Sequence, residues 1–180
     1  MAANRKKAYP LITKASKKQH TEMVRDIFAT IPEGYDLLNR ILSLRRDVAW
    51  RRFAVGRMKF FKTNRLLDLA TGTADLAMEA ALAYPHIDIV ALDFVKEMIK
   101  RGQRKIAKQG LSKRIQLLQA DALFLPVDDS AFDVASIAFG IRNIPERLNT
   151  LQEMVRVIAA GGQVVVLEMH LPGNKYVRKV

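Results

Sequence analysis

The sequence predicts an α/β domain built on a parallel sheet of about five strands. Short apolar runs alternate with segments of helical periodicity between residues 66 and 169. An acid or a glycine follows most of the apolar runs directly. Strands joined through helices run parallel, with right-handed crossovers. The residues that follow the strands should therefore meet at one edge of the sheet.

The elements follow from these patterns in chain order. Pro85 ends an alanine-rich helix, Gly110 caps a second helix, and Gly161-Gly162 ends a third that has Pro145 in its first turn. In the second helix, Lys105 belongs to a row of cations expected to face solvent. We expect strands at 66–69, 87–92, 114–119, 132–139 and 163–169, and helices at 76–83, 95–109 and 145–160.

The part before the first strand differs from the rest in charge. Residues 1–65 carry 16 lysines and arginines against 5 acids, whereas residues 66–180 carry 14 against 13. We expect a basic, disordered tail at 1–20, a helical lid at 21–62 and the ligand-binding domain at 63–180. Such a basic segment attracts anionic lipid or nucleic acid, or is simply a solvated surface.

The composition excludes several other classes of protein. The chain has no cysteine, so it has no disulfide, thiolate metal site or cysteine nucleophile, and we predict no metal centre. No apolar run approaches the length of a membrane span, and the first residues lack the apolar core of a secretory signal. We expect a cytoplasmic protein.

The segment Leu66–Ala77 is the centre of the prediction. It combines a buried strand with a glycine turn and a helix start. Gly72 permits a tight turn and a close approach of a ligand to the backbone, and Thr73 is expected to cap the following helix. Asp68 lies near the end of a buried strand, where an unpaired carboxylate is costly. A ligand is a common partner at that edge.

Two cofactors compete for this turn. A dinucleotide would require the pattern G-x-G-x-x-G, whereas the turn has one glycine and two acids, Asp68 and Asp75. S-adenosylmethionine (SAM) carries a sulfonium and an ammonium, which suit negative charge. Asp93, 25 residues after Asp68, fits a carboxylate that binds ribose hydroxyls. The alternative interpretation is a pair of solvated acids at strand ends.

Several motifs together resemble one family. They are Tyr35-Asp36 with Asn39, Trp50-Arg51, the turn from Asp68 to Asp75, and Phe139-Gly140-Ile141-Arg142-Asn143. The chain from about Val24 to Met169 is similar to the ubiquinone/menaquinone biosynthesis C-methyltransferases, which are class I SAM-dependent enzymes. The resemblance implies a Rossmann-like fold and a polyprenylated quinol as substrate, either a demethylmenaquinol or a methoxy-polyprenyl-benzoquinol.

The resemblance also implies roles for individual residues. The catalytic residues would be Arg142, Asn143 and Tyr35. Asp68, Gly72 and Thr73 would bind the methionine portion of SAM, Asp93 the ribose, and Asp121 with Ala122 the adenine. Ala70, Phe94 and Ala138 complete the expected cofactor contacts, and S-adenosyl-L-homocysteine would be the product.

Three features depart from the family pattern. Ala74 replaces the last glycine of the turn, and Ala138 replaces a serine near the cofactor. The sequence also ends soon after the fifth expected strand, so we expect the C-terminal antiparallel strands that the resemblance implies to be missing from it. A second copy covering the exposed sheet edge is one expectation, and peripheral contact with an anionic membrane is another. A non-catalytic SAM-binding subunit and an RNA methyltransferase remain alternatives, but nucleic acid is not the partner that we expect.

Overall fold

The computed structural model describes Met23, Asp26 and residues 46–169. The expected tail at residues 1–20, the segment 27–45 with Tyr35, and residues 170–180 lie outside the described residues. The family motif at residues 35–39 is therefore not placed.

Five parallel strands form one sheet in the order β3-β2-β1-β4-β5. This confirms the predicted fold class. The chain first winds outward from β1 to β3, then returns to β4 beside β1, so the strand order reverses between β1 and β4. Ligands bind at such a reversal in open α/β sheets. The strands are β1 (Arg65–Leu69), β2 (Asp88–Asp93), β3 (Ile115–Gln119), β4 (Phe132–Ala138) and β5 (Ile158–Leu167).

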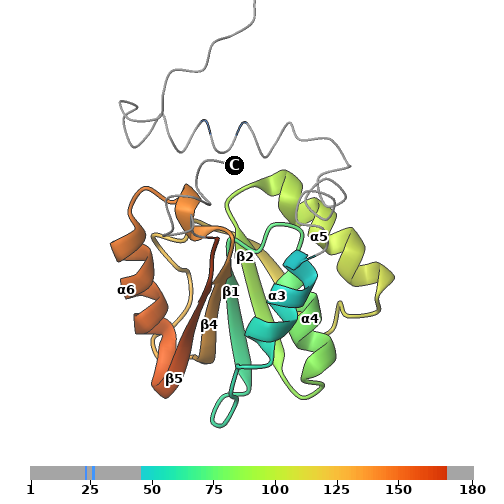
Figure 1. Ribbon diagram of the computed structural model, residues 1–180, viewed down its shortest axis with the longest axis horizontal. Coiled ribbons are helices and arrows are strands. Elements are labelled where there is room, and N and C mark those ends of the chain that lie inside the picture. The colour runs from blue at the N-terminus through green and yellow to red at the C-terminus, as the bar shows by residue number, and fades with distance from the viewer. Residues whose placement is uncertain (1–22, 24–25, 27–45, 170–180) are drawn as a thin grey trace, which may run out of the picture.

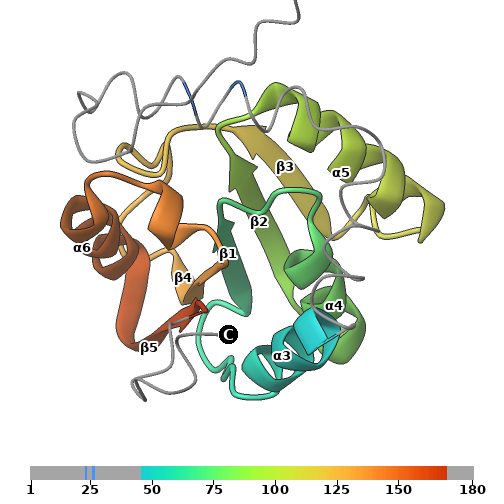
Figure 2. The same cartoon turned by 45° about the horizontal axis from the view of Figure 1, so that its top comes forward.

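Helices cover both faces of the sheet. Among the described helices, α3, α4 and α5 lie on one face of the sheet and α6 lies on the other (Figures 1 and 2). No described helix is long and apolar enough to cross a membrane. The helices are α3 (Arg46–Val55), α4 (Asp75–Ala83), α5 (Lys96–Lys108) and α6 (Arg147–Val157).

The central strands are apolar on both sides because each side has its own core. Leu66 and Val134 pack with α4 into one cluster, whereas Leu67 and Phe132 pack with α6 into the other. All four side chains are fully buried. This burial explains why β1 and β4 are continuous apolar runs rather than alternating patterns. The packing in both clusters fixes where the strands end, and so positions the loops that follow them.

The start of β5 was predicted wrongly. Helix α6 ends at Val157, and β5 begins at Ile158, so Gly161-Gly162 lies within the strand and does not end a helix. Gly161 has a φ of +88°, and a Cβ on Gly162 would lie 2.6 Å from the carbonyl oxygen of Asp133. The two glycines therefore allow an irregular start to the pairing of β5 with β4.

The start of α6 also differs from the prediction. Pro145 lies before the helix, whose N-cap is Glu146, and a 3₁₀ helix spans Ile141–Asn143. The other boundaries differ from those predicted by a few residues, as expected for element ends.

Asp133 organises the edge of the sheet opposite the carboxyl ends of the strands. Its carboxylate accepts hydrogen bonds from the backbone N–H groups of residues 61–64 at 2.9–3.1 Å. Burial alone would raise its pKa, but these donors stabilise the charged form and hold the pKa below its usual value. The carboxylate thus fixes the loop that leads into β1.

Candidate active site

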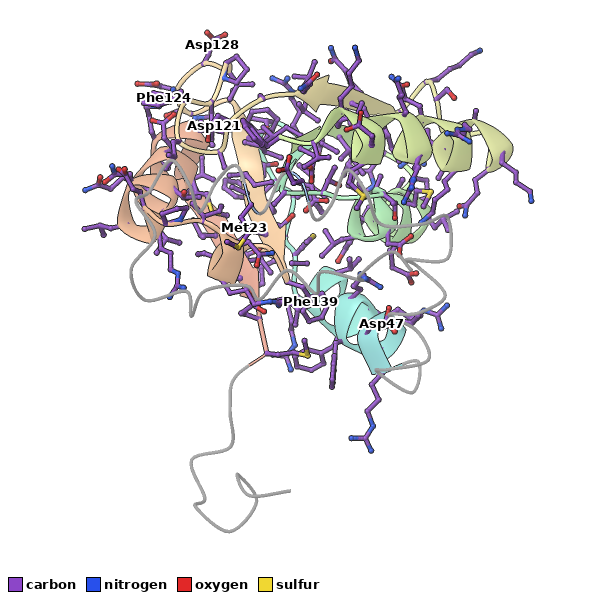
Figure 3. All side chains as sticks on the ribbon, turned by 90° about the horizontal axis from the view of Figure 1, so that it is seen from above. Met23, Asp47, Asp121, Phe124, Asp128 and Phe139 are labelled. Carbon is purple, nitrogen blue, oxygen red and sulfur yellow. The ribbon has the colours of Figure 1, made fainter. Side chains whose placement is uncertain are left out.

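The carboxyl ends of the strands open into a cavity of about 380 Å³. Its walls come from the loops after β1, β2, β3 and β4, and from α3. Figure 3 looks down on this edge and labels Asp121 and Phe139, from the loops after β3 and β4, and Asp47 on α3. All predicted site residues within the described part line it: Asp68, Ala70, Gly72, Thr73, Asp93, Phe94, Asp121, Ala122, Ala138, Arg142 and Asn143.

The turn after β1 has an unusual backbone. Ala70, Gly72 and Ala74 all have positive φ values, of 47°, 58° and 66°. A Cβ on Gly72 would meet no atom within 4 Å, so the backbone here borders open space. Thr73 does not cap α4, contrary to prediction, because Ala74 occupies the N-cap position and no side chain caps it. This turn exposes backbone where a ligand can approach closely.

Asp68 is buried at the end of β1. Its two oxygens accept hydrogen bonds from the hydroxyls of Thr71, at 2.6 Å, and Ser136, at 2.8 Å. Burial raises the pKa of Asp68 to about 6, although these bonds and the positive charge of Arg51 act to lower it. The ionised carboxylate of Asp68 would attract a cationic ligand, and the positive charge of that ligand would lower the pKa of Asp68.

Asp93 ties the ends of β1 and β2 together. One of its oxygens accepts from the N–H of Gly72 at 2.8 Å, and the other accepts from the N–H of Val95 at 2.9 Å. Burial raises the pKa of Asp93 despite these bonds. Each carboxylate oxygen has a second lone pair, so the group can still accept from a ligand hydroxyl.

The loop after β3 forms another wall. The Asp121 carboxylate accepts from the N–H of Leu123 at 2.9 Å, which holds it in a turn. Ala122 beside it is buried, and Phe94, after β2, is exposed. This part of the cavity thus offers a hydrogen-bond acceptor, the carboxylate of Asp121, between apolar surfaces. Such an arrangement suits a heteroaromatic base.

The loop after β4 brings a second set of polar groups. Arg142 forms an ion pair with Glu168, which follows β5, and its own N–H also points to that carboxylate. Asn143 ends the short 3₁₀ helix beside it. The pairing holds the guanidinium of Arg142 at the cavity wall, although 43% of its side chain remains exposed.

Helix α3 contributes three side chains to the cavity wall. The sequence did not assign them to the site. Asp47, Trp50 and Arg51 line it, and the Trp50 ring lies 6.2 Å from the ring of Phe139. Arg51 donates to Asp47 at 2.7 Å, one helical turn earlier. The spacing of four residues between an acid and an arginine was the available signal.

Lys105 was expected to face solvent, and this was wrong. Its ammonium donates to the hydroxyl of Thr73 at 2.8 Å and forms an ion pair with Asp75. The long side chain thus brings its ammonium from α5 to the turn after β1 and the start of α4. Thr73 and Asp75 are therefore held from outside the cavity.

Comparison with solved structures supports the fold. The geranyl diphosphate C-methyltransferase of Streptomyces coelicolor, solved with S-adenosyl-L-homocysteine, superposes with a TM-score of 0.69 at 12% identity, over 82% of this chain and 63% of that one. A SAM-dependent methyltransferase from Aquifex aeolicus gives a TM-score of 0.58 at 18% identity, over 90% of this chain and 77% of that one. The two solved structures therefore share the fold of this chain.

Comparison with curated proteins identifies the family. The ubiquinone/menaquinone biosynthesis C-methyltransferase UbiE of Geotalea daltonii is 43% identical over 152 residues, which are 84% of this chain and 65% of that protein. The demethylmenaquinone methyltransferase of Thermus thermophilus is 44% identical over 146 residues, 81% of this chain and 66% of that protein. The chain spans just under two thirds of the length of these relatives. Residues 13–180 also match the family model, and the chain belongs to the ubiE/COQ5 methyltransferase family.

Proposed function

We propose that this chain binds SAM and carries the catalytic centre of a C-methyltransferase that acts on a polyprenylated quinol. The observation that carries the proposal is the single cavity shared by the strand-end acids and the Arg142-Asn143 pair. Family membership supplies the reaction class. The relatives named for ubiquinone/menaquinone biosynthesis and demethylmenaquinone suggest the substrate, a demethylmenaquinol or a methoxy-polyprenyl-benzoquinol.

The cavity fits the proposed cofactor in size and charge. Its volume of about 380 Å³ is in the range of small-ligand sites. The open position above Gly72 leaves room for a ligand against the backbone. Five carboxylates line the cavity, which favours a ligand with a sulfonium and an ammonium over a pyrophosphate. They are Asp47, Asp68, Asp75, Asp93 and Asp121.

Three of these acids have distinct proposed contacts with the cofactor. When bound, SAM supplies an electrophilic methyl group on a sulfonium. Asp68 lies near the methionine portion, Asp93 accepts from ribose hydroxyls, and Asp121 accepts from the exocyclic amine of adenine. The rigid turn amides that already fix Asp93 would keep its acceptors in place, which is the positioning that an in-line transfer requires.

Catalysis at ring carbon requires an electron-rich quinol. Loss of a proton from the hydroxyl adjacent to the reacting carbon pushes electron density onto that carbon. We propose that Arg142 stabilises the resulting negative oxygen, and that Asn143 orients it. Arginine stays protonated, so it acts by charge and not as a base. Tyr35 remains the proposed proton relay or pocket wall.

A direct assay tests this function. The full chain is incubated with SAM labelled in its methyl group and with a short-chain demethylmenaquinol, and methylated quinol is measured. We expect turnover that falls at least tenfold in Arg142→Ala while S-adenosylhomocysteine binding persists. Binding without turnover on any tested quinol would favour the non-catalytic alternative. Transfer to RNA in place of quinol would contradict the proposed substrate.

We also propose peripheral contact with an anionic membrane, where a prenylated quinol resides. Four exposed cations spaced four residues apart on α5 add to the basic N-terminal segment. Sedimentation with phosphatidylglycerol vesicles should fall in the double variant Lys100→Glu/Arg104→Glu. Sedimentation should be unchanged in Lys113→Glu, because Lys113 is an exposed cation that lies outside the basic segment and outside α5. The four cations are Lys96, Lys100, Arg104 and Lys108.

A second copy of the chain is the proposed cover for the outer edge of β5. Among the described strands, β5 has a partner only on the β4 side, and Val166 on it is 45% exposed. Unpaired strand edges invite pairing with another chain. Sedimentation equilibrium should give a dimer, and a strict monomer at micromolar concentration would contradict this.

A further inference from the structure

The cations that line the cavity are few. Among the described lining residues there are two, Arg51 and Arg142, against five carboxylates. The amino-acid portion of SAM is a zwitterion, so its carboxylate would meet net negative charge unless a cation received it. The position of that cation determines which way the amino-acid portion points.

Each of the two arginines already pairs with an acid, Arg142 with Glu168 and Arg51 with Asp47, so pairing does not decide between them. Arg142 lies after β4 and is already assigned to the negative oxygen of the proposed quinol. The Arg51 side chain is only 16% exposed, compared with 43% for Arg142. Arg51 lies close enough to Asp68 for its charge to lower the pKa of that acid. It therefore stands at the same end of the cavity as the turn after β1.

The guanidinium of Arg51 is held by Asp47, and some of its N–H groups make no hydrogen bond to the described part of the chain. Its Nη1 donates to Asp47 at 2.7 Å and lies 3.8 Å from the carboxylate of Asp75. Its central carbon lies 5.5 Å from the centre of the Phe139 ring. No other hydrogen bond joins it to the described part of the chain, so its Nε and Nη2 groups remain for a ligand. A planar fork of this kind matches a carboxylate in two-point geometry.

We propose that Arg51 binds the carboxylate of the amino-acid portion of SAM. This rests on the proposed use of SAM. Asp68 lies on the side of the ammonium, and Arg51 on the side of the carboxylate, so the two recognise opposite ends of the zwitterion. Because Arg51 belongs to α3, the bound carboxylate also links α3 to the turn after β1. Cofactor binding thus stabilises the contact of α3 with the cavity.

A pair of ligands isolates this contact. S-adenosylhomocysteine carries the carboxylate, and its decarboxylated analogue, with a 3-aminopropylthio group on the adenosine, does not. Calorimetric titration of both ligands is made with the wild type, Arg51→Gln, Arg51→Lys and Arg52→Gln. Arg52 is a neighbouring control on α3 that pairs with Glu79 and does not line the cavity.

We expect Arg51→Gln to weaken S-adenosylhomocysteine binding by roughly 10- to 100-fold, the range for hydrogen bonds to charged groups. Affinity for the decarboxylated analogue should stay within about twofold, a smaller change than the loss of one such bond. Arg51→Lys should restore part of the preference for the ligand with the carboxylate, and Arg52→Gln should keep that preference.

Two results would overturn the assignment. Equal loss for both ligands in Arg51→Gln would mean that Arg51 only holds α3 in place, and no loss for either would mean that another group receives the carboxylate. In both cases wild-type binding of S-adenosylhomocysteine leaves the proposed cofactor intact. A folded wild type that binds neither ligand would instead remove the proposed cofactor, and this assignment with it.

Discussion

A Cβ on Gly140 would lie 2.7 Å from the Cβ of Ala70. The turn after β1 and the turn after β4 therefore touch at a point where only one of them can carry a side chain. Ala70 is itself in the left-handed region, with a φ of 47°, and lines the cavity. The proposed cofactor turn and the Arg142-Asn143 loop are thus fitted to each other through backbone contact.

Gly140→Ala should destabilise the fold by about 1–3 kcal/mol, the range for overpacking. It should also weaken S-adenosylhomocysteine binding, because Ala70 must move. Urea unfolding and titration measure both effects. The rescue variant is Ala70→Gly/Gly140→Ala, since glycine accepts the φ of Ala70 and removes the other Cβ. If the double variant is no more stable than Gly140→Ala, the two turns do not clash as the geometry indicates.

Asp68 should make the unliganded protein less stable as pH rises from about 4 to 6. Its folded pKa is about 6, above the ordinary value of 3.8, so the folded state binds the proton more tightly than the unfolded state. The stabilisation that protonated Asp68 contributes is fully present below pH 3.8 and is lost as the pH rises through about 6. Two pKa units correspond to about 3 kcal/mol.

Asp68→Asn tests this directly because it removes the titration and keeps the size. The free energy of unfolding of the variant, relative to wild type, should rise with pH across that window. Asp93, whose negative charge also raises the pKa of Asp68, is present in both proteins. Parallel curves for the two proteins between pH 4 and 7 would show that Asp68 has an ordinary pKa.

Asp133 should change the stability of the fold with pH in the opposite direction to Asp68. Its pKa is lowered in the folded state, so its contribution is present at neutral pH and is lost as pH falls through the folded pKa. Asp133→Asn should destabilise the fold by about 2–3 kcal/mol at pH 7, because charge-assisted bonds to backbone N–H groups are lost. Thermal and urea unfolding measure this loss.

The matched control for Asp133 is Asp88→Asn. Asp88 is also an acid at the start of a strand, but it is exposed. Its substitution should change stability by less than about 0.5 kcal/mol. Neither variant should alter S-adenosylhomocysteine affinity in the folded protein, since both residues lie outside the cavity lining. Equal stability losses for the two variants would argue against the role of the backbone donors.

Glu168 should act as a positioning residue for Arg142. Glu168→Gln removes the ion pair and leaves the guanidinium without its fixed orientation. We expect the methyl-transfer kcat to fall by roughly 10- to 100-fold, as misplacement of a catalytic group does, with S-adenosylhomocysteine affinity unchanged. Glu79→Gln breaks a comparable ion pair to Arg52 away from the cavity, and should leave kcat unchanged. A parallel loss of cofactor binding in Glu168→Gln would indicate a structural role instead.

Local pattern was enough to predict the architecture. The alternation of apolar runs and amphipathic segments determines a parallel sheet, and the chain direction of each strand determines which loops share its carboxyl edge. Asp68, Gly72, Asp93 and Asp121 could be assigned to one site for that reason alone. Every described residue predicted for the site does line the cavity.

The errors and omissions have a common cause, which is that partner groups lie far apart in the sequence. Arg142 and Glu168 are 26 residues apart, Lys105 and Asp75 are 30 apart, and Asp133 and Phe61 are 72 apart. Gly161-Gly162 has the local signature of a helix end, but packing against the backbone at Asp133 places it inside β5. The sequence by itself determined the order of the elements and the edge of the sheet that carries the site. Only the tertiary structure decided which charges pair there, because pairing depends on distances that no local pattern encodes.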